Sequence, residues 1–146
     1  MIKASTGLRD HLMTEGALRT ALHEGVIRIY QGTPPLSADA ALGGAMLLST
    51  ITGPDEAGLV FETTADNGSL LKNSEVWSGD NVATGTASFY RHVLLADDGS
   101  ESTTALRIQG TCGTIASTAD MRLSSTSLTE GATQTLDFYA VTLPTP

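Results

Sequence analysis

The sequence predicts a mostly β protein: an antiparallel β-sandwich, jelly-roll-like, with a short N-terminal helical segment. Three observations lead to this prediction. The composition is rich in Thr, Ser, Ala and Gly and has only 16% charged residues, which suits strands and turns better than long solvated helices. Helical periodicity is confined to the start of the chain. About eight strand candidates then follow at fairly regular spacing, separated by turn residues.

The helical signal lies in residues 1–25. Leucines recur there in two pairs at i,i+4 spacing, Leu8 with Leu12 and Leu18 with Leu22, which places each pair on one helix face. The pattern predicts two short helices or one kinked helix. This segment either docks on a partner as an arm or covers the open end of its own sandwich. The four leucines are therefore candidate partner-contact residues.

Capping residues mark the ends of this segment. Ser5 or Thr6 can cap its start, since both offer a side-chain oxygen to the first free N–H groups. Thr14 can cap a second helix after a break near Gly16, and Gly25 stands where a left-handed C-cap is expected. The helical segment should thus end at residue 25.

From residue 26 the pattern becomes that of strands. The segment 26–30 is β-branched and aromatic, which suits a pleated surface, and the prolines at 34 and 35 end it because they lack backbone donors. Further candidates are 45–52, 59–64, 75–78, 86–95, 105–109, 121–128 and 133–143. We expect one domain, with residues 1–25 packed on or extending from a β-sandwich of residues 26–146.

The last strand candidate has the clearest alternation. Leu136, Phe138, Ala140 and Thr142 fall on one face, and the alternating residues fall on the other. Because the second face mixes polar and apolar side chains, the pattern leaves open which face belongs to the core.

The charge excludes several classes of partner. The net charge of −8 repels nucleic-acid phosphates and anionic membrane surfaces, so we expect neither direct nucleic-acid binding nor membrane binding. It suits a basic protein partner, or simply keeps the protein soluble. The N-terminal residues contain no apolar run of signal-peptide length, and no segment approaches the roughly twenty apolar residues that span a bilayer. We expect the protein to be made and folded in a cytoplasm.

No catalytic constellation is visible, so we do not expect an enzyme. The three histidines, His11, His23 and His92, form no His-Glu-x-x-His pair, and no serine lies in Gly-x-Ser-x-Gly. The single cysteine, Cys112, cannot form an internal disulfide. It would be a nucleophile only if His92 approached it in the fold, and the alternative is a small apolar side chain in a sheet.

No cofactor or metal site is expected either. Residues 97–101 gather three carboxylates around a glycine but lack the ligand spacing of an EF-hand, and an exposed hairpin turn explains them. The glycines at 43 and 44 precede a strand and no lysine motif follows, so neither a P-loop nor a dinucleotide fingerprint is present.

Trp77 is the aromatic residue open to two interpretations. It precedes a Gly-Asp-Asn turn, so it could be an exposed platform for a sugar or another partner. Large aromatic side chains in small β proteins more often supply core area. We include Trp77 with the four leucines as a candidate partner-contact residue.

Local sequence adds a resemblance. The stretches that carry it are Ile2–Arg9, Ile27–Pro34 with Ala38–Ala41, Val76–Gly79, Gly85–His92 and Arg107–Thr111. Together they cover most of the chain, and in them the chain resembles small structural proteins encoded by tailed bacteriophages. None of them is a mechanistic motif.

The resemblance implies a virion component made in the host cytoplasm, most specifically a capsid cement or decoration protein on the phage head. Its implied partners are the major capsid protein and itself, as a homo-dimer or trimer. The alternative is a tail or neck component with a carbohydrate- or receptor-binding β-sandwich. A small hydrolase acting on the cell envelope is least supported, because no acid, base and nucleophile set can be assembled.

Overall fold

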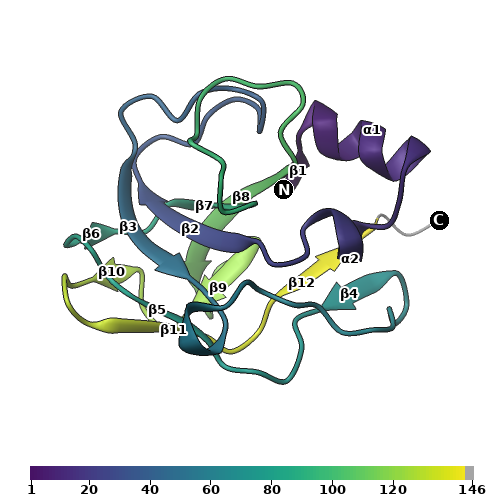
Figure 1. Ribbon diagram of the computed structural model, residues 1–146. Coiled ribbons are helices and arrows are strands. Elements are labelled where there is room, and N and C mark those ends of the chain that lie inside the picture. Colours follow the sequence, from purple (N-terminus) through teal and green to yellow (C-terminus); the bar gives the residue numbers. More distant parts are fainter. Residues whose placement is uncertain (144–146) are drawn as a thin grey trace.

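The computed structural model describes residues 1–143 and consists mainly of short strands (Figure 1). The helices are α1 (Thr6–Thr14), α2 (Leu18–Ala21) and the 3-10 turn η1 (Pro54–Glu56). The strands are β1 (Lys3–Ala4), β2 (Val26–Gln31), β3 (Met46–Ile51), β4 (Ser69–Leu71), β5 (Trp77–Asp80), β6 (Gly85–Thr86), β7 (Phe89–Val93), β8 (Arg107–Thr114), β9 (Met121–Leu123), β10 (Ser127–Leu128), β11 (Thr133–Leu136) and β12 (Ala140–Thr142).

The main sheet has the order β1-β8-β7-β2-β3, and β9 also pairs with β8. All of its pairs are antiparallel except β8 with β9, which is parallel. Since β7 occupies one edge of β8, β1 and β9 share the other. β1 pairs at Ile108 and Gln109, and β9 pairs from Cys112 onward.

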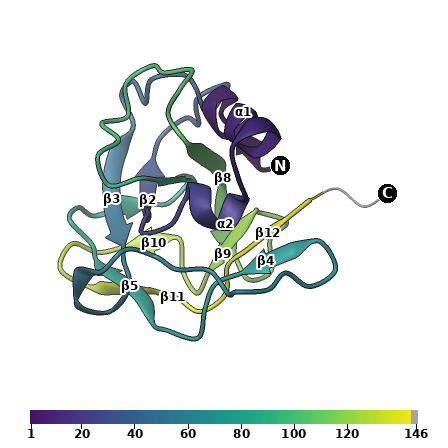
Figure 2. The same ribbon diagram turned by 45° about the vertical axis from the view of Figure 1, so that its right-hand side comes forward.

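Three antiparallel two-stranded ribbons, β10 with β6, β11 with β5 and β12 with β4, make up the rest of the strands. In both views β5, β10 and β11 lie below β2 and β3, and β4 lies below α2 (Figure 2). The fold is therefore mostly β, antiparallel and sandwich-like, with a short N-terminal helical segment, as the sequence predicts. The jelly-roll-like strand path stays a prediction.

The helical segment forms two short helices. Ser5, not Thr6, caps α1, since its Oγ accepts the Leu8 N–H at 3.1 Å. The prediction that Thr14 caps a second helix is wrong. Thr14 ends α1 and its hydroxyl donates to the Asp10 carbonyl, while α2 begins after Ala17 without a side-chain cap.

The left-handed residue after α2 is Glu24, with φ 58°, and not Gly25 as predicted. Gly25 meets a different requirement. A Cβ at this position would lie 2.7 Å from the Val93 carbonyl oxygen, so close packing against β7 demands glycine there.

Most strand candidates are confirmed with shifted ends. The candidate at 59–64 forms no strand, and only isolated bridges join Leu59 to Gly25 and Phe61 to Lys72. The candidates at 86–95, 121–128 and 133–143 are each divided into two strands. β1 and β4 were not predicted, because two or three residues are too few to show a period.

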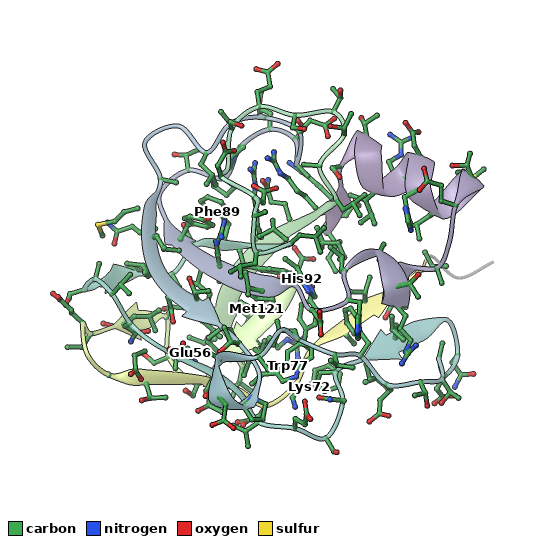
Figure 3. All side chains as sticks on the ribbon, viewed as in Figure 1. Glu56, Lys72, Trp77, Phe89, His92 and Met121 are labelled. Carbon is green, nitrogen blue, oxygen red and sulfur yellow. The ribbon has the colours of Figure 1, made fainter. Side chains whose placement is uncertain are left out.

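The core lies between the main sheet and the ribbons. Alternate residues of the sheet, among them Ile29, Tyr90, His92 and Ile108, are buried there. Figure 3 shows His92, Met121 and Trp77 on this side, with Phe89 on the other side of β7.

The opposite face of the main sheet carries buried arginines beside the stacked rings of Tyr30 and Phe89, and loops cover it. Arg107 pairs with Asp97 at 2.6 Å and donates to the Ala38 carbonyl at 3.2 Å. Arg91 donates to Gln109 at 2.9 Å and to the Ala40 carbonyl at 2.7 Å. The covering loops are residues 32–45 and 94–106. The two buried arginines hold both loops against the sheet.

Candidate docking surface

The structure separates the five predicted partner-contact residues into two groups. Leu8, Leu22 and Trp77 are at most 1% exposed and belong to the core of the chain itself. Leu12 and Leu18 are only partly buried against that core. The helical segment thus covers its own sandwich through Leu8 and Leu22, and only Leu12 and Leu18 remain near the surface.

Trp77 is a structural core residue and offers no platform to a partner. Its indole N–H donates to the Asn73 side chain at 3.1 Å, and its ring packs against Phe61 and Tyr139 with centroids 6.1 and 5.9 Å away. The Lys72 ammonium group lies 5.3 Å from the ring centroid. The interpretation of Trp77 as an exposed platform does not hold, because its ring fills the core between the main sheet and the ribbons.

A groove of about 620 Å³ runs along the helical segment, between β1, the two helices and the end of β12. We call it the N-terminal groove. Met1 and Leu143 at its mouth are 96% and 65% exposed. Its described lining residues are Met1, Ile2, Ala4, Leu8, Leu12, Leu18, Ile108, Asp120, Val141, Thr142 and Leu143. All but Asp120 and Thr142 are apolar.

A second groove, of about 630 Å³, adjoins the first and shares Ile2, Asp120 and Thr142 with it. We call it the β9 groove, since Arg122 of β9 forms part of its wall. Its described lining residues are Ile2, Ser69, Leu71, Ile115, Ala119, Asp120, Arg122, Ser124, Thr135, Asp137, Phe138, Tyr139, Ala140 and Thr142.

Two apolar side chains project at the β9 groove. Ile115 is 70% exposed and Phe138 is 67% exposed. A large aromatic side chain in water has an unfavourable hydration free energy of a few kcal/mol relative to burial. Exposed apolar groups that cluster along one side of a molecule mark an interaction surface.

Asp120 joins the two grooves. Its Oδ2 accepts hydrogen bonds from the Thr111 N–H at 2.9 Å and the Thr111 hydroxyl at 3.0 Å, and lies 3.2 Å from the Met1 nitrogen. Partial burial raises the pKa of Asp120, but the hydrogen bonds from Thr111 outweigh this and hold the pKa below its usual value. Asp120 therefore positions the start of the chain against β9.

The strands around the two grooves have free edges. Within residues 1–143, β1 and β9 each pair only with β8, and β12 pairs only with β4. Backbone groups on their other edges have no strand neighbour. The grooves thus lie along the open edge of the sandwich.

The side chains considered for catalysis do not come together. His92 pairs in register with Ile108, four residues along β8 from Cys112, a distance of about 13 Å at strand rise. Burial raises the pKa of the Cys112 thiol, so it is not a reactive thiolate. The geometry gives no nucleophile and base pair at this position.

Two of the three carboxylates at residues 97–101 have partners within the chain. Asp97 forms the buried pair with Arg107, and Asp98 accepts from the N–H and hydroxyl of Ser100. Across the described residues, no group of three or more His, Cys, Asp or Glu side chains is placed to hold a metal ion.

Sequence reasoning missed Phe138 and Ile115. Phe138 was grouped with Leu136 by strict alternation, but residues 137–139 lie between β11 and β12, so the phase changes there. Leu136 and Tyr139 are buried while Phe138 points outward. An aspartate directly before the phenylalanine was the available signal for a break in the strand.

The fold and this surface define a mostly β, sandwich-like protein with an exposed apolar edge. The chain matches no family model, no curated protein and no solved structure. In the described part of the chain, no helix is long and apolar enough to cross a membrane.

Proposed function

We propose that this protein is a structural virion protein, a capsid cement or decoration protein that stabilises the head of a tailed phage. It acts through protein–protein contacts and not as an enzyme. The observation that carries the proposal is the N-terminal groove, an almost wholly apolar surface at which Met1 and Leu143 are 96% and 65% exposed. The resemblance of several sequence stretches to phage structural proteins supplies the setting.

The chemistry of the groove suits a protein partner such as the major capsid protein. Burying apolar side chains contributes about 25 cal/mol for each Å² removed from water. The lining carries one carboxylate, Asp120, already held by Thr111, so few charges lose hydration when a partner covers the groove. Many copies on one symmetric shell then add modest interfaces into a large stabilisation.

The test uses purified protein and heads of the phage that encodes it, with two matched variants. Leu143 lies at the N-terminal groove and Leu95 lies away from it, and they are 65% and 70% exposed. We expect Leu143→Asp to weaken head binding about tenfold or more, while Leu95→Asp binds like the unmodified protein.

Copy number distinguishes the head from other locations. Hundreds of copies at symmetry positions on the head, seen by cryo-electron microscopy, are expected. A few copies at the tail or neck, or none in the particle, would overturn the cement proposal. Equal loss of binding in both variants would remove the N-terminal groove as its docking surface.

A tail or neck component that binds carbohydrate is the second candidate, and Phe138 is the observation that favours it. Phe138 shares the β9 groove with Ser124 and Thr135, which carry hydroxyl groups, and sugars bind where an aromatic ring and polar groups lie in one site. A glycan array with unmodified protein and Phe138→Ala checks it. Binding that depends on Phe138 would favour this candidate over cement.

A further inference from the structure

We propose that the β9 groove is the interface of a homodimer in which two copies of this chain meet across a two-fold axis. Each copy inserts Phe138 into the groove of the other. The inference rests on the proposed function only in taking the chain to work through protein contacts, and it assigns the β9 groove to self-association and the N-terminal groove to the capsid.

The apolar part of the interface fits this arrangement. Phe138 projects from the segment between β11 and β12, and Ile115 projects from the turn after β8. Beside them the groove has apolar walls from Ile2, Leu71 and Ala140. A two-fold axis brings the projecting group of each copy to the hollow of the other, because the same surface patch serves both partners.

The charges of the groove are self-complementary. Arg122 stands on β9, and Asp137 stands beside Phe138. Neither makes a hydrogen bond or ion pair with another described side chain, although both line the same groove. Across a two-fold axis Arg122 of one copy meets Asp137 of the other, and the reverse contact follows by symmetry. Two ion pairs then form for each dimer.

This charge pattern favours a second copy over a strongly charged partner. Each chain has a net charge of −8, but repulsion between distant charges is screened beyond about 8 Å at physiological salt. Within the β9 groove the charges of Arg122 and Asp137 sum to zero, and Asp120 is already bound by Thr111 and the Met1 nitrogen. A strongly basic partner surface would repel Arg122, and a strongly acidic one would repel Asp137.

The first measurement is sedimentation equilibrium of the unmodified protein up to about 100 µM, a concentration at which even a weak dimer with a Kd of about 40 µM assembles. We expect a species of about twice the 15.1 kDa chain mass. A monomer throughout this range, or a trimer, would overturn the two-fold dimer.

Charge reversal tests the geometry. Arg122→Asp and Asp137→Arg should each weaken dimerisation about tenfold or more, and the double variant Arg122→Asp/Asp137→Arg should recover most of the loss. Arg9→Asp, an exposed charge on α1, is the matched control and should leave the dimer intact. A double variant no better than the single variants would overturn the paired arrangement.

Phe138→Asp tests the apolar contact and should give a monomer, while Leu95→Asp, equally exposed but outside the groove, should not. Circular dichroism of each variant checks that the fold is kept, as expected for exposed positions. A dimer unchanged by Phe138→Asp would overturn the proposal, and glycan binding lost in this variant by a monomeric protein would assign the groove to sugar. Head binding is measured separately, so failure of the dimer and failure of the cement function give different results.

Discussion

His92 lies beside Tyr139 at the centre of the protein, with ring centroids 5.7 Å apart. Phe61 approaches the same imidazole at 5.5 Å. His92 is fully buried, and neither ring nitrogen has a hydrogen-bond partner among the described residues. The core therefore contains a titratable ring that must stay neutral.

Acid should destabilise the protein through His92. Burial lowers its pKa from 6.5 to about 3, so between these values the unfolded chain binds a proton and the folded chain does not. Stability from this residue is therefore complete above pH 6.5 and falls as pH falls toward 3, by about 1.4 kcal/mol per pH unit. Urea unfolding at several pH values should show a shallower acid slope in His92→Phe. Replacing the exposed His23 by Gln is the control, and equal slopes in all three proteins would contradict the prediction.

Trp77→Ala should lower the free energy of unfolding by about 3–5 kcal/mol, because it leaves a large cavity in the core between the main sheet and the ribbons. The ring is fully buried and packs against Phe61 and Tyr139. Urea unfolding followed by circular dichroism measures the loss. A change below about 1 kcal/mol, similar to that of a surface substitution, would place Trp77 outside the core.

Asp97→Asn should destabilise the loop that covers the Arg107 face of the main sheet. It breaks the buried pair with Arg107 and leaves a guanidinium without its countercharge, at a cost of about 3–5 kcal/mol. Hydrogen exchange should rise first at residues 94–106. Asp98→Asn, an exposed neighbour, is the control and should leave exchange in this loop nearly unchanged.

Gly79→Ala should disturb the junction between β3 and β5. A Cβ at this position would lie 1.9 Å from the Thr50 carbonyl oxygen, so the backbones of the two strands must separate. Overpacking of this kind costs about 1–3 kcal/mol or more. Gly44→Ala, where a Cβ meets nothing within 4 Å, should not lower the melting temperature. Equal melting temperatures for both variants would show that the junction relaxes freely.

The sequence predicted those elements whose residue pattern is visible within one local segment. The β-branched run of β2 and the i,i+4 leucines are local signals, and both elements form where the pattern places them. It could not place β1, because two residues become a strand only through their register with Ile108 and Gln109. Such pairing is a tertiary relationship that no local period records.

The same distinction holds for the docking surface. The spacing of Leu8, Leu12, Leu18 and Leu22 predicts an apolar face, but not how much of it the chain itself covers. Packing against the sheet buries Leu8 and Leu22 and leaves the other two at the groove. Phe138 was misassigned because alternation assumes an unbroken strand, and Phe138 lies in the break between β11 and β12.

The hydrogen bonds of Ser5 limit the order in which the parts of the chain can fold. Its hydroxyl donates to the Ala105 carbonyl at 2.7 Å and accepts the Arg107 N–H at 3.0 Å, partners about 100 residues later in the chain. A ribosome releases the first helix well before those partners exist. Until β8 has been synthesised, β1 has no partner strand and β7 has only one of its two neighbouring strands. The main sheet of the nascent chain therefore stays incomplete. Completion of the sheet is then a late event, in which β1 pairs with β8 after more than 100 residues have been made.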